Sequence, residues 1–270
     1  MQEPDLVADL HLLEQSVRDA GTVASSLFGG AVRSWSKKGG SPVSEADLAV
    51  NALLEARLRP ARPSYGWLSE ESADSKARLT ARTLFVIDPI DGTSAFIRHR
   101  PQFTICAAVV HDGRPLCGVV FNPILDEFFS AAQGRGAHLN GATIQVSGQQ
   151  AIEGCRMLAG GVIFRYPQWQ IPPLPPWPQM HVENRSSIAY RLALVAAGRF
   201  DAALVQSAKH EWDLAAAEIV VTEAGGRVSD HSGRPFRYNG PTAQLAPYVC
   251  AGPSLHEALL ERLHATPLPK

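Results

Sequence analysis

The segment 86–93 reads Val86-Ile87-Asp88-Pro89-Ile90-Asp91-Gly92-Thr93, and the interpretation of the whole chain starts from it. The apolar run 83–87 predicts a buried strand that ends at Asp88. Pro89 fixes one φ angle, and Gly92 permits backbone conformations that other residues resist. The two aspartates of this segment can therefore turn toward one point.

Two carboxylates a few ångströms apart repel each other, so they need a cation or a shared proton. Their hard oxygen ligands suit Mg²⁺, which retains several waters and pairs with substrate phosphate. A short helix beginning at Gly92 and Thr93 would direct backbone N–H groups at a phosphate. Spacing alone leaves a second interpretation open, in which the segment is an Asp-rich turn with capped ends.

Two further acidic sites support the metal interpretation. Glu70 and Glu71 directly follow the strand-like segment 65–68, and Asp213 opens a helix whose next residues are small and apolar. Asp213 could complete a metal cage at the rim of a buried helix. It could equally be a cap or a partner of the helix dipole.

Composition excludes several classes of function. The chain has 270 residues, of which 45% are apolar and 19% charged, with a formal net charge of -1. This balance gives no support for a nucleic-acid groove or an anionic membrane surface. The N-terminal residues are acidic and do not resemble a signal peptide, and no stretch approaches the roughly 20 apolar residues of a membrane span. The four cysteines are scattered singly, which suggests reduced core residues in a cytoplasmic protein.

Residues 1–150 are expected to form an α+β half that carries most of the metal ligands. Helical spacing predicts helices over 5–27 and from Ser44, a plausible N-cap, to about residue 58. Apolar runs separated by turn signals predict an antiparallel sheet. Those runs cover 103–110, 116–121 and 128–132.

Residues 151–270 are expected to form an α/β half that supplies Asp213 and substrate contacts, because helical and strand-like patterns alternate there. The predicted strands are 157–159, 202–205 and segments near Arg227 and Tyr248; the predicted helices are 187–197, 212–224 and 255–264. The Pro- and Trp-rich loop 166–178 is either a stiff surface connection or a flap over a pocket.

Three motifs together resemble the signature set of the inositol monophosphatase superfamily. They are the hexapeptide 88–93, Glu70-Glu71-Ser72, and Trp212-Asp213 followed by residues 222–226. The resemblance spans nearly the whole chain. It implies a layered αβαβα sandwich of the inositol monophosphatase and fructose-1,6-bisphosphatase type, usually a homodimer. It also implies lithium-sensitive hydrolysis of a small phosphate monoester with two or three Mg²⁺ ions.

The resemblance also implies which residues hold the metal. Glu70, Asp88 and the backbone carbonyl of Ile90 would hold one Mg²⁺, and Asp88, Asp91 and Asp213 a second. A third ion would lie near Glu70 and water. Mg²⁺ would lower the pKa of a bound water and so supply a nucleophile near neutral pH.

The catalytic residues implied in this way are Asp47, Thr93 and Glu70. The Thr93 hydroxyl, oriented by Asp47, would position the attacking water, although Asp47 also fits ordinary first-turn helix chemistry. The Gly92 and Thr93 amides would hold the phosphate. Ser187 and Glu211 are expected to contact substrate.

The substrate is less well defined by the sequence. Three segments resemble the 3′(2′),5′-bisphosphate nucleotidase branch: Ser41-Pro42-Val43-Ser44, the run 96–100 and the run 113–120. The first hypothesis is therefore that the protein converts adenosine 3′,5′-bisphosphate to AMP and phosphate. Ser94 and Val205 depart from that branch, which often has basic residues there. An inositol-1-phosphatase, another sugar or polyol phosphatase, or a histidinol phosphatase is the alternative. A non-catalytic binding protein of the same fold is the third hypothesis, and the clustered carboxylates argue against it.

Overall fold

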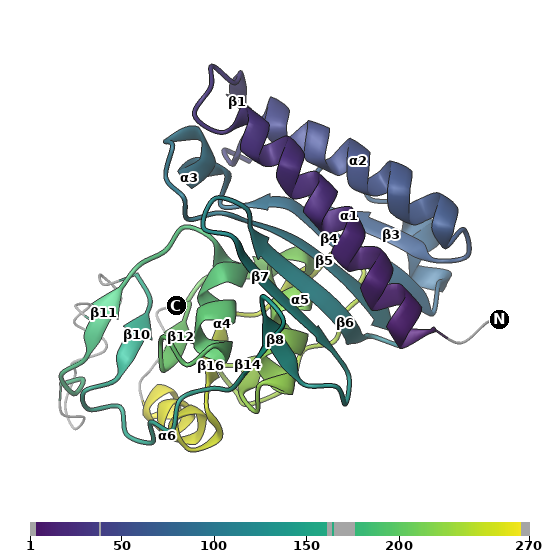
Figure 1. Ribbon diagram of the computed structural model, residues 1–270. Helices are drawn as coiled ribbons and strands as arrows, with labels where there is room; N and C mark the ends of the chain where they lie inside the picture. Colours follow the sequence, from purple (N-terminus) through teal and green to yellow (C-terminus); the bar gives the residue numbers. More distant parts are fainter. Residues whose placement is uncertain (1–3, 38, 161–163, 165–175, 266–270) are drawn as a thin grey trace.

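The computed structural model describes residues 4–37, 39–160, 164 and 176–265, and these stack in five layers (Figure 1). Helices α1 (Leu6–Leu27) and α2 (Glu45–Ala61) lie side by side over one face of a seven-stranded sheet. Helices α4 (Ile188–Ala196) and α5 (Glu211–Glu223) separate this sheet from a five-stranded sheet, which α6 (Pro253–His264) covers from outside. The predicted αβαβα sandwich is confirmed.

The seven-stranded sheet has the order β3-β4-β5-β6-β7-β8-β9. Its strands are β3 (Gly66–Ser69), β4 (Thr83–Asp91), β5 (Thr104–His111), β6 (Arg114–Asn122), β7 (Glu127–Ala132), β8 (Ala137–Leu139) and β9 (Ala142–Ile144). The runs predicted to pair antiparallel, now β5, β6 and β7, do so. The sheet as a whole is mixed, because β3 at its edge runs parallel to β4. The connection through residues 70–82, with the 3₁₀ helix η1 (Lys76–Thr80), is long enough for a parallel crossover.

Strand β4 continues past Asp88, where the sequence predicted its end. The pairing with β5 shifts register between Asp88 and Asp91 and resumes at the pair Asp91–Thr104. Pro89 lacks an N–H group and cannot donate to the ladder, which accounts for the interruption. The irregularity places both aspartates on the same stretch of strand.

The five-stranded sheet has the order β11-β10-β12-β16-β14. Its strands are β11 (His181–Glu183), β10 (Arg156–Leu158), β12 (Ala202–Leu204), β16 (Tyr248–Ala251) and β14 (Arg227–Asp230). Two small ribbons pair β1 (Ser34–Ser36) with β2 (Pro42–Ser44) and β13 (Lys209–His210) with β15 (Gln244–Leu245). Most of the predicted loop 166–178 lies outside the described residues.

Strand β6 lies between two helices that approach its opposite faces closely. A Cβ atom at Gly118 of β6 would lie 2.9 Å from the Ala216 Cα of α5, and one at Gly21 of α1 would lie 2.3 Å from the Phe121 ring of β6. These contacts leave room only for hydrogen at each position. Helix α5 therefore lies directly on the seven-stranded sheet.

The two sheets fall on either side of residue 150, but one apolar core connects them. Buried residues of β6, α4, α5 and β16 belong to the same cluster. Whether 1–150 and 151–270 are separate structural halves thus stays a prediction. No helix in the described part of the chain is long and apolar enough to cross a membrane.

Candidate active site

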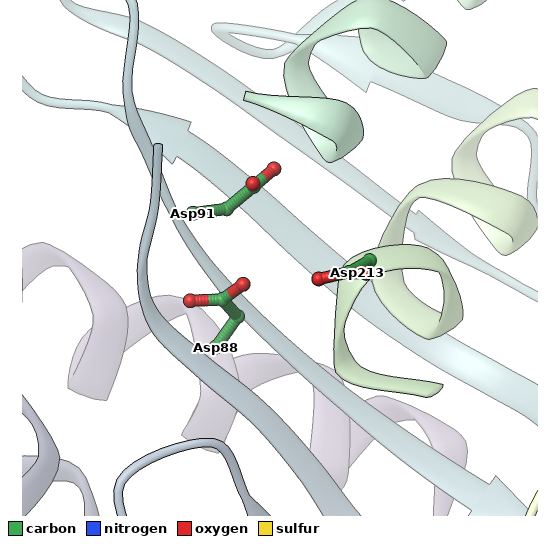
Figure 2. Close-up of side chains that lie close together, drawn as sticks. All are labelled: Asp88, Asp91 and Asp213. Atoms are coloured by element: carbon green, nitrogen blue, oxygen red, sulfur yellow. The ribbon is translucent and has the colours of Figure 1, made fainter. Parts of the chain in front are cut away.

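Three aspartates from two elements converge at the carboxyl end of β4. Asp88 and Asp91 lie on β4, and Asp213 lies in the first turn of α5 (Figure 2). One carboxylate oxygen from each lies within 4.8 Å of those of the other two. The predicted convergence of these three side chains is therefore present in the structure.

The turn after β4 depends on Gly92. Its φ of +99° lies in the left-handed region, and a Cβ atom there would lie 3.1 Å from Gln102 O and 3.2 Å from Ser187 N. The Gly92 carbonyl accepts hydrogen bonds from Ala95 and Phe96, so the short helix α3 (Thr93–Ile97) begins immediately after it. The predicted short helix after the aspartates is thus observed.

Asp91 is held by the N-terminus of α4. Its Oδ2 accepts hydrogen bonds from Ser187 Oγ and Ala189 N, both at 2.6 Å, and Ser187 Oγ lies 2.9 Å from Thr104 Oγ1. Burial and then the charge of Asp213 raise the pKa of Asp91 to about 7, although these hydrogen bonds oppose the shift. The carboxylate is fixed in orientation but is not neutralised by a cationic side chain.

Asp88 is the least compensated of the three. Its Oδ1 is buried and has no hydrogen-bond partner among the described residues. Burial, and then the charges of Glu70 and Asp91, raise the pKa of Asp88 well above its usual value. The pKa of Asp213 rises to about 6 through burial, against a hydrogen bond that its Oδ2 accepts from His210 N at 2.8 Å.

The arrangement fits a hard divalent cation. A buried carboxylate oxygen without a donor, close to two other carboxylates, costs free energy unless a cation or proton reaches it. Only oxygen ligands are present in this cluster, which is the chemistry that Mg²⁺ prefers. The three aspartates could therefore hold a metal ion.

Glu70 lies near this cluster but outside it. Its Oε1 accepts a hydrogen bond from Lys37 Nζ at 2.9 Å, and Lys37 also pairs with Glu71. Its charge acts on Asp88, as the raised pKa of that group shows. The Lys37 ammonium is therefore the cation that lies beside Glu70 in this structure.

Thr93 and Asp47 form a buried hydrogen-bonded pair. Thr93 Oγ1 donates to Asp47 Oδ1 at 2.8 Å and lies 3.1 Å from the Ile90 carbonyl oxygen. The other oxygen of Asp47 accepts from Ser44 N at 2.8 Å and Ser44 Oγ at 2.6 Å, which closes the capping box of α2. Burial raises the pKa of Asp47. Asp47 thus both caps a helix and holds Thr93.

Two of the expected substrate contacts have other partners. Ser187 is fully buried and donates to Asp91. Both carboxylate oxygens of Glu211 accept backbone N–H groups, from Asn239 at 2.7 Å and Gly240 at 2.6 Å. Ser187 therefore orients a candidate metal ligand, and Glu211 anchors a turn. Their contact with substrate stays a prediction.

Lys37 and His210 lie beside the carboxylates, and no motif in the sequence predicted a role for either. His210 stacks on Trp212 with ring centroids 4.5 Å apart and planes 8° from parallel. Its place directly before Glu211-Trp212-Asp213 was the only available signal. Lys37 lies in a polar break, and nothing in its local pattern indicates that it contacts Glu70.

Comparison with known proteins agrees with this geometry. The sequence model of the inositol monophosphatase family matches residues 7–267. The chain belongs to the inositol monophosphatase family. An inositol-1-monophosphatase from Rhizobium meliloti is 31% identical, over 93% of this chain and 94% of that protein. The Nus factor SuhB of Pseudomonas aeruginosa is 38% identical over 71% and 73% of the two chains. The solved structure of a Thermotoga maritima IMPase superimposes with a TM-score of 0.80 at 28% identity, covering 96% of each chain.

Family membership makes this protein a metal-dependent phosphomonoesterase, as predicted, and indicates a small-molecule substrate. The comparisons do not extend to a bisphosphate nucleotidase specificity, lithium sensitivity or a dimer. Some relatives carry the name Nus factor, which does not describe a hydrolase. The expected absence of a nucleic-acid partner thus stays a prediction, as does the cytoplasmic location.

Replacing Asp88 or Asp91 with asparagine should abolish turnover without unfolding the protein. Each substitution removes one negative charge from a repelling cluster, so the melting temperature without Mg²⁺ should hold or rise. Asp201→Asn is the matched control, because buried Asp201 is compensated by Arg156 at 2.7 Å. This variant should lose stability and keep turnover. Normal turnover of Asp88→Asn at saturating Mg²⁺ would contradict the site.

The metal-free protein should lose stability as pH rises from about 5 to 8. The pKa values of Asp91 and Asp213, about 7 and about 6, lie above the ordinary aspartate value of 3.8. The folded state therefore binds more protons than the unfolded state in this window, and its stability falls as they dissociate. Thermal melts across this range should show the slope in wild type and a flatter slope in Asp91→Asn. Equal slopes would refute this assignment.

Proposed function

We propose that this protein hydrolyses the phosphate monoester of a small polyol, of which inositol-1-phosphate is the first candidate, with Mg²⁺ bound at Asp88, Asp91 and Asp213. The observation that carries the proposal is the convergence of these carboxylates around the unpartnered Asp88 Oδ1. A binding module gains no stability from such a cluster, whereas phosphate transfer needs positive charge held at this kind of place.

Glu70 and the Ile90 carbonyl extend the proposed ligand set, with two or three ions in total. When bound, Mg²⁺ supplies charge that activates water and stabilises the leaving alkoxide. Glu70 would have to exchange Lys37 for this cation, since the two side chains are 2.9 Å apart. Ser187 and the N-terminus of α4 keep Asp91 oriented throughout.

Thr93 and Asp47 are the proposed water-positioning pair. The Thr93 hydroxyl donates to Asp47, so its lone pairs remain able to accept a hydrogen bond from the attacking water. Asp47, with a pKa raised by burial, can then accept a proton through this hydroxyl. The Gly92 and Thr93 amides, at the start of α3, are the proposed phosphate contacts.

The choice of a polyol monophosphate rests on the relatives and on the described cationic side chains. Proteins named inositol-1-monophosphatase match over most of this chain. A nucleoside bisphosphate would need cations for a second phosphate. Arg191 is occupied by the Arg185 carbonyl and the Asn184 side chain, so it is not available for that role. The bisphosphate nucleotidase therefore stays a prediction that the same assay tests.

A kinetic comparison of substrates tests the proposal. With Mg²⁺ present, kcat/KM for inositol-1-phosphate should exceed that for adenosine 3′,5′-bisphosphate and histidinol phosphate by about tenfold or more. The blank is the Asp88→Asn variant. A higher kcat/KM for the bisphosphate would show that the proposed substrate is wrong and that the protein is nevertheless a phosphomonoesterase. Hydrolysis of none of the three above the blank would overturn both.

The water-positioning pair predicts non-additive kinetics. Thr93→Ala and Asp47→Asn should each lower kcat by on the order of 10²-fold with little change in KM. The double variant should be little worse than either single, since the pair acts as one unit.

Ser44→Ala is the matched control for this cycle, because it removes a helix cap that also bonds to Asp47 and leaves Thr93 in place. It should cost about 1 kcal/mol of stability and leave kcat near that of wild type. Small additive rate losses in Thr93→Ala and Asp47→Asn, accompanied by reduced melting temperatures, would show that the two residues serve only as helix caps.

A further inference from the structure

An elongated cavity of about 810 Å³ lies along the free edge of the seven-stranded sheet, outside the carboxylate cluster. Strand β3 forms one side and the face of α2 that carries Asn51, Glu55 and Arg59 forms the opposite side. The segment 71–82 lines the rest, down to the first residue of β4. We refer to this cavity as the β3 groove.

Strand β3 is the end strand of its sheet, so its outer side has no partner strand among the described residues. Glu70 N donates to Ile87 O of β4 at 3.3 Å. In a parallel ladder, residues bonded to the neighbouring strand alternate with residues whose main-chain groups face outward. The Trp67 N–H and C=O groups therefore face outward, where no other described residue bonds to them, and Trp67 lines the β3 groove.

This edge is recessed between a helix and a loop. An exposed flat edge would invite pairing with whole sheets of other molecules. Here, α2 and the segment 71–82 flank the edge, and the cavity of about 810 Å³ between them is the space that a partner chain could occupy. Helix, edge strand and an unpaired main-chain donor and acceptor are the parts used when a peptide adds one strand to a sheet.

The charges of the β3 groove are unequal at its two ends. Arg59 and Arg82 lie near the N-terminal end of β3, with side chains 56% and 45% exposed. Arg82 holds Asp112 through two hydrogen bonds and contributes positive charge to this end of the groove. Arg59 pairs with the partly exposed Glu55, and such a surface pair holds a guanidinium weakly. A guanidinium has five N–H donors, so Arg59 can also donate to a carboxylate of a ligand. At the other end lies Glu71, which Lys37 already holds.

We propose that the β3 groove binds an extended acidic peptide of a partner protein, which pairs with the main chain of Trp67 and directs a carboxylate to Arg59 and Arg82. The main-chain pairing is independent of the partner's side chains. The arginine end selects for negative charge and sets the direction of the peptide. This binding does not depend on the proposed phosphatase substrate.

The probe is a short fluorescein-labelled peptide of alternating threonine and valine that ends in two aspartates, titrated against the full chain by fluorescence anisotropy. Binding should be saturable below about 1 mM. The same peptide with alternate N-methylated amides, which cannot pair with a strand, should bind at least about tenfold more weakly. A version ending in two lysines should be weakened similarly.

Protein variants separate the β3 groove from general surface charge. Arg59→Gln should weaken the acidic peptide about tenfold. Arg57→Gln is the matched control, because Arg57 lies on the same helix, is 52% exposed and pairs with Asp19 away from the groove. It should bind the peptide as wild type does. Amide hydrogen exchange at Trp67 should slow when the peptide is bound.

Several outcomes would overturn the proposal. One is the absence of saturable binding of the acidic peptide. Another is equal binding of the N-methylated peptide, or unchanged exchange at the Trp67 amide, since either excludes strand pairing. Displacement of the peptide by glutarate at equal concentration would show that the cavity binds small dianions instead. Equal losses in Arg57→Gln and Arg59→Gln would show non-specific charge attraction.

Discussion

The convergence of three carboxylates at one point, with Asp88 and Asp91 buried and Asp213 partly buried, is the constraint on which the rest of this structure depends. Without compensation, such a cluster would open or remain protonated. The fold compensates it with backbone donors rather than with buried cations. The N-terminus of α4 supplies Ala189 N and Ser187 to Asp91, and His210 N donates to Asp213. Asp88 Oδ1 receives no donor from the described residues, so this oxygen needs a cation or a proton.

The three carboxylates can converge only if segments that are distant in sequence pack together closely. Asp213 reaches β4 because α5 lies directly on the sheet, and it can do so because Gly118 has no side chain. Any Cβ at that position would lift the helix by a few tenths of an ångström or more. The packing of α5 on the sheet therefore also fixes the geometry of the site. A substitution at Gly118, which is distant in sequence from the three aspartates, would change both.

The sequence predicted the features that depend on local patterns. The strand before Asp88, the helix after Glu211 and the Ser44 cap follow from apolar runs and capping chemistry, and the pattern after residue 150 indicated alternating elements. The parallel pairing of β3 was not predictable in this way, because an edge strand of four residues is too short for its pattern to distinguish a parallel from an antiparallel neighbour. Strands of two or three residues, such as β13, have no period to detect. The hydrogen-bond partners of buried polar groups could not be predicted either, and the bonds from Asn239 and Gly240 to Glu211 have no signal in the sequence.

Asp47 shows why structural and catalytic roles cannot always be separated by pattern. One of its oxygens completes the capping box with Ser44, and the other accepts the Thr93 hydroxyl. The cap fixes the carboxylate against rotation, because Asp47 Oδ2 is bonded to both the backbone N–H and the hydroxyl of Ser44. Oδ1 is then held toward Thr93, the one hydrogen-bond donor that reaches it among the described residues. A helix start and a hydroxyl-orienting group thus use the same side chain, and the bond from the Ser44 backbone N–H, which Ser44→Ala retains, provides the rigidity that positioning a water molecule requires.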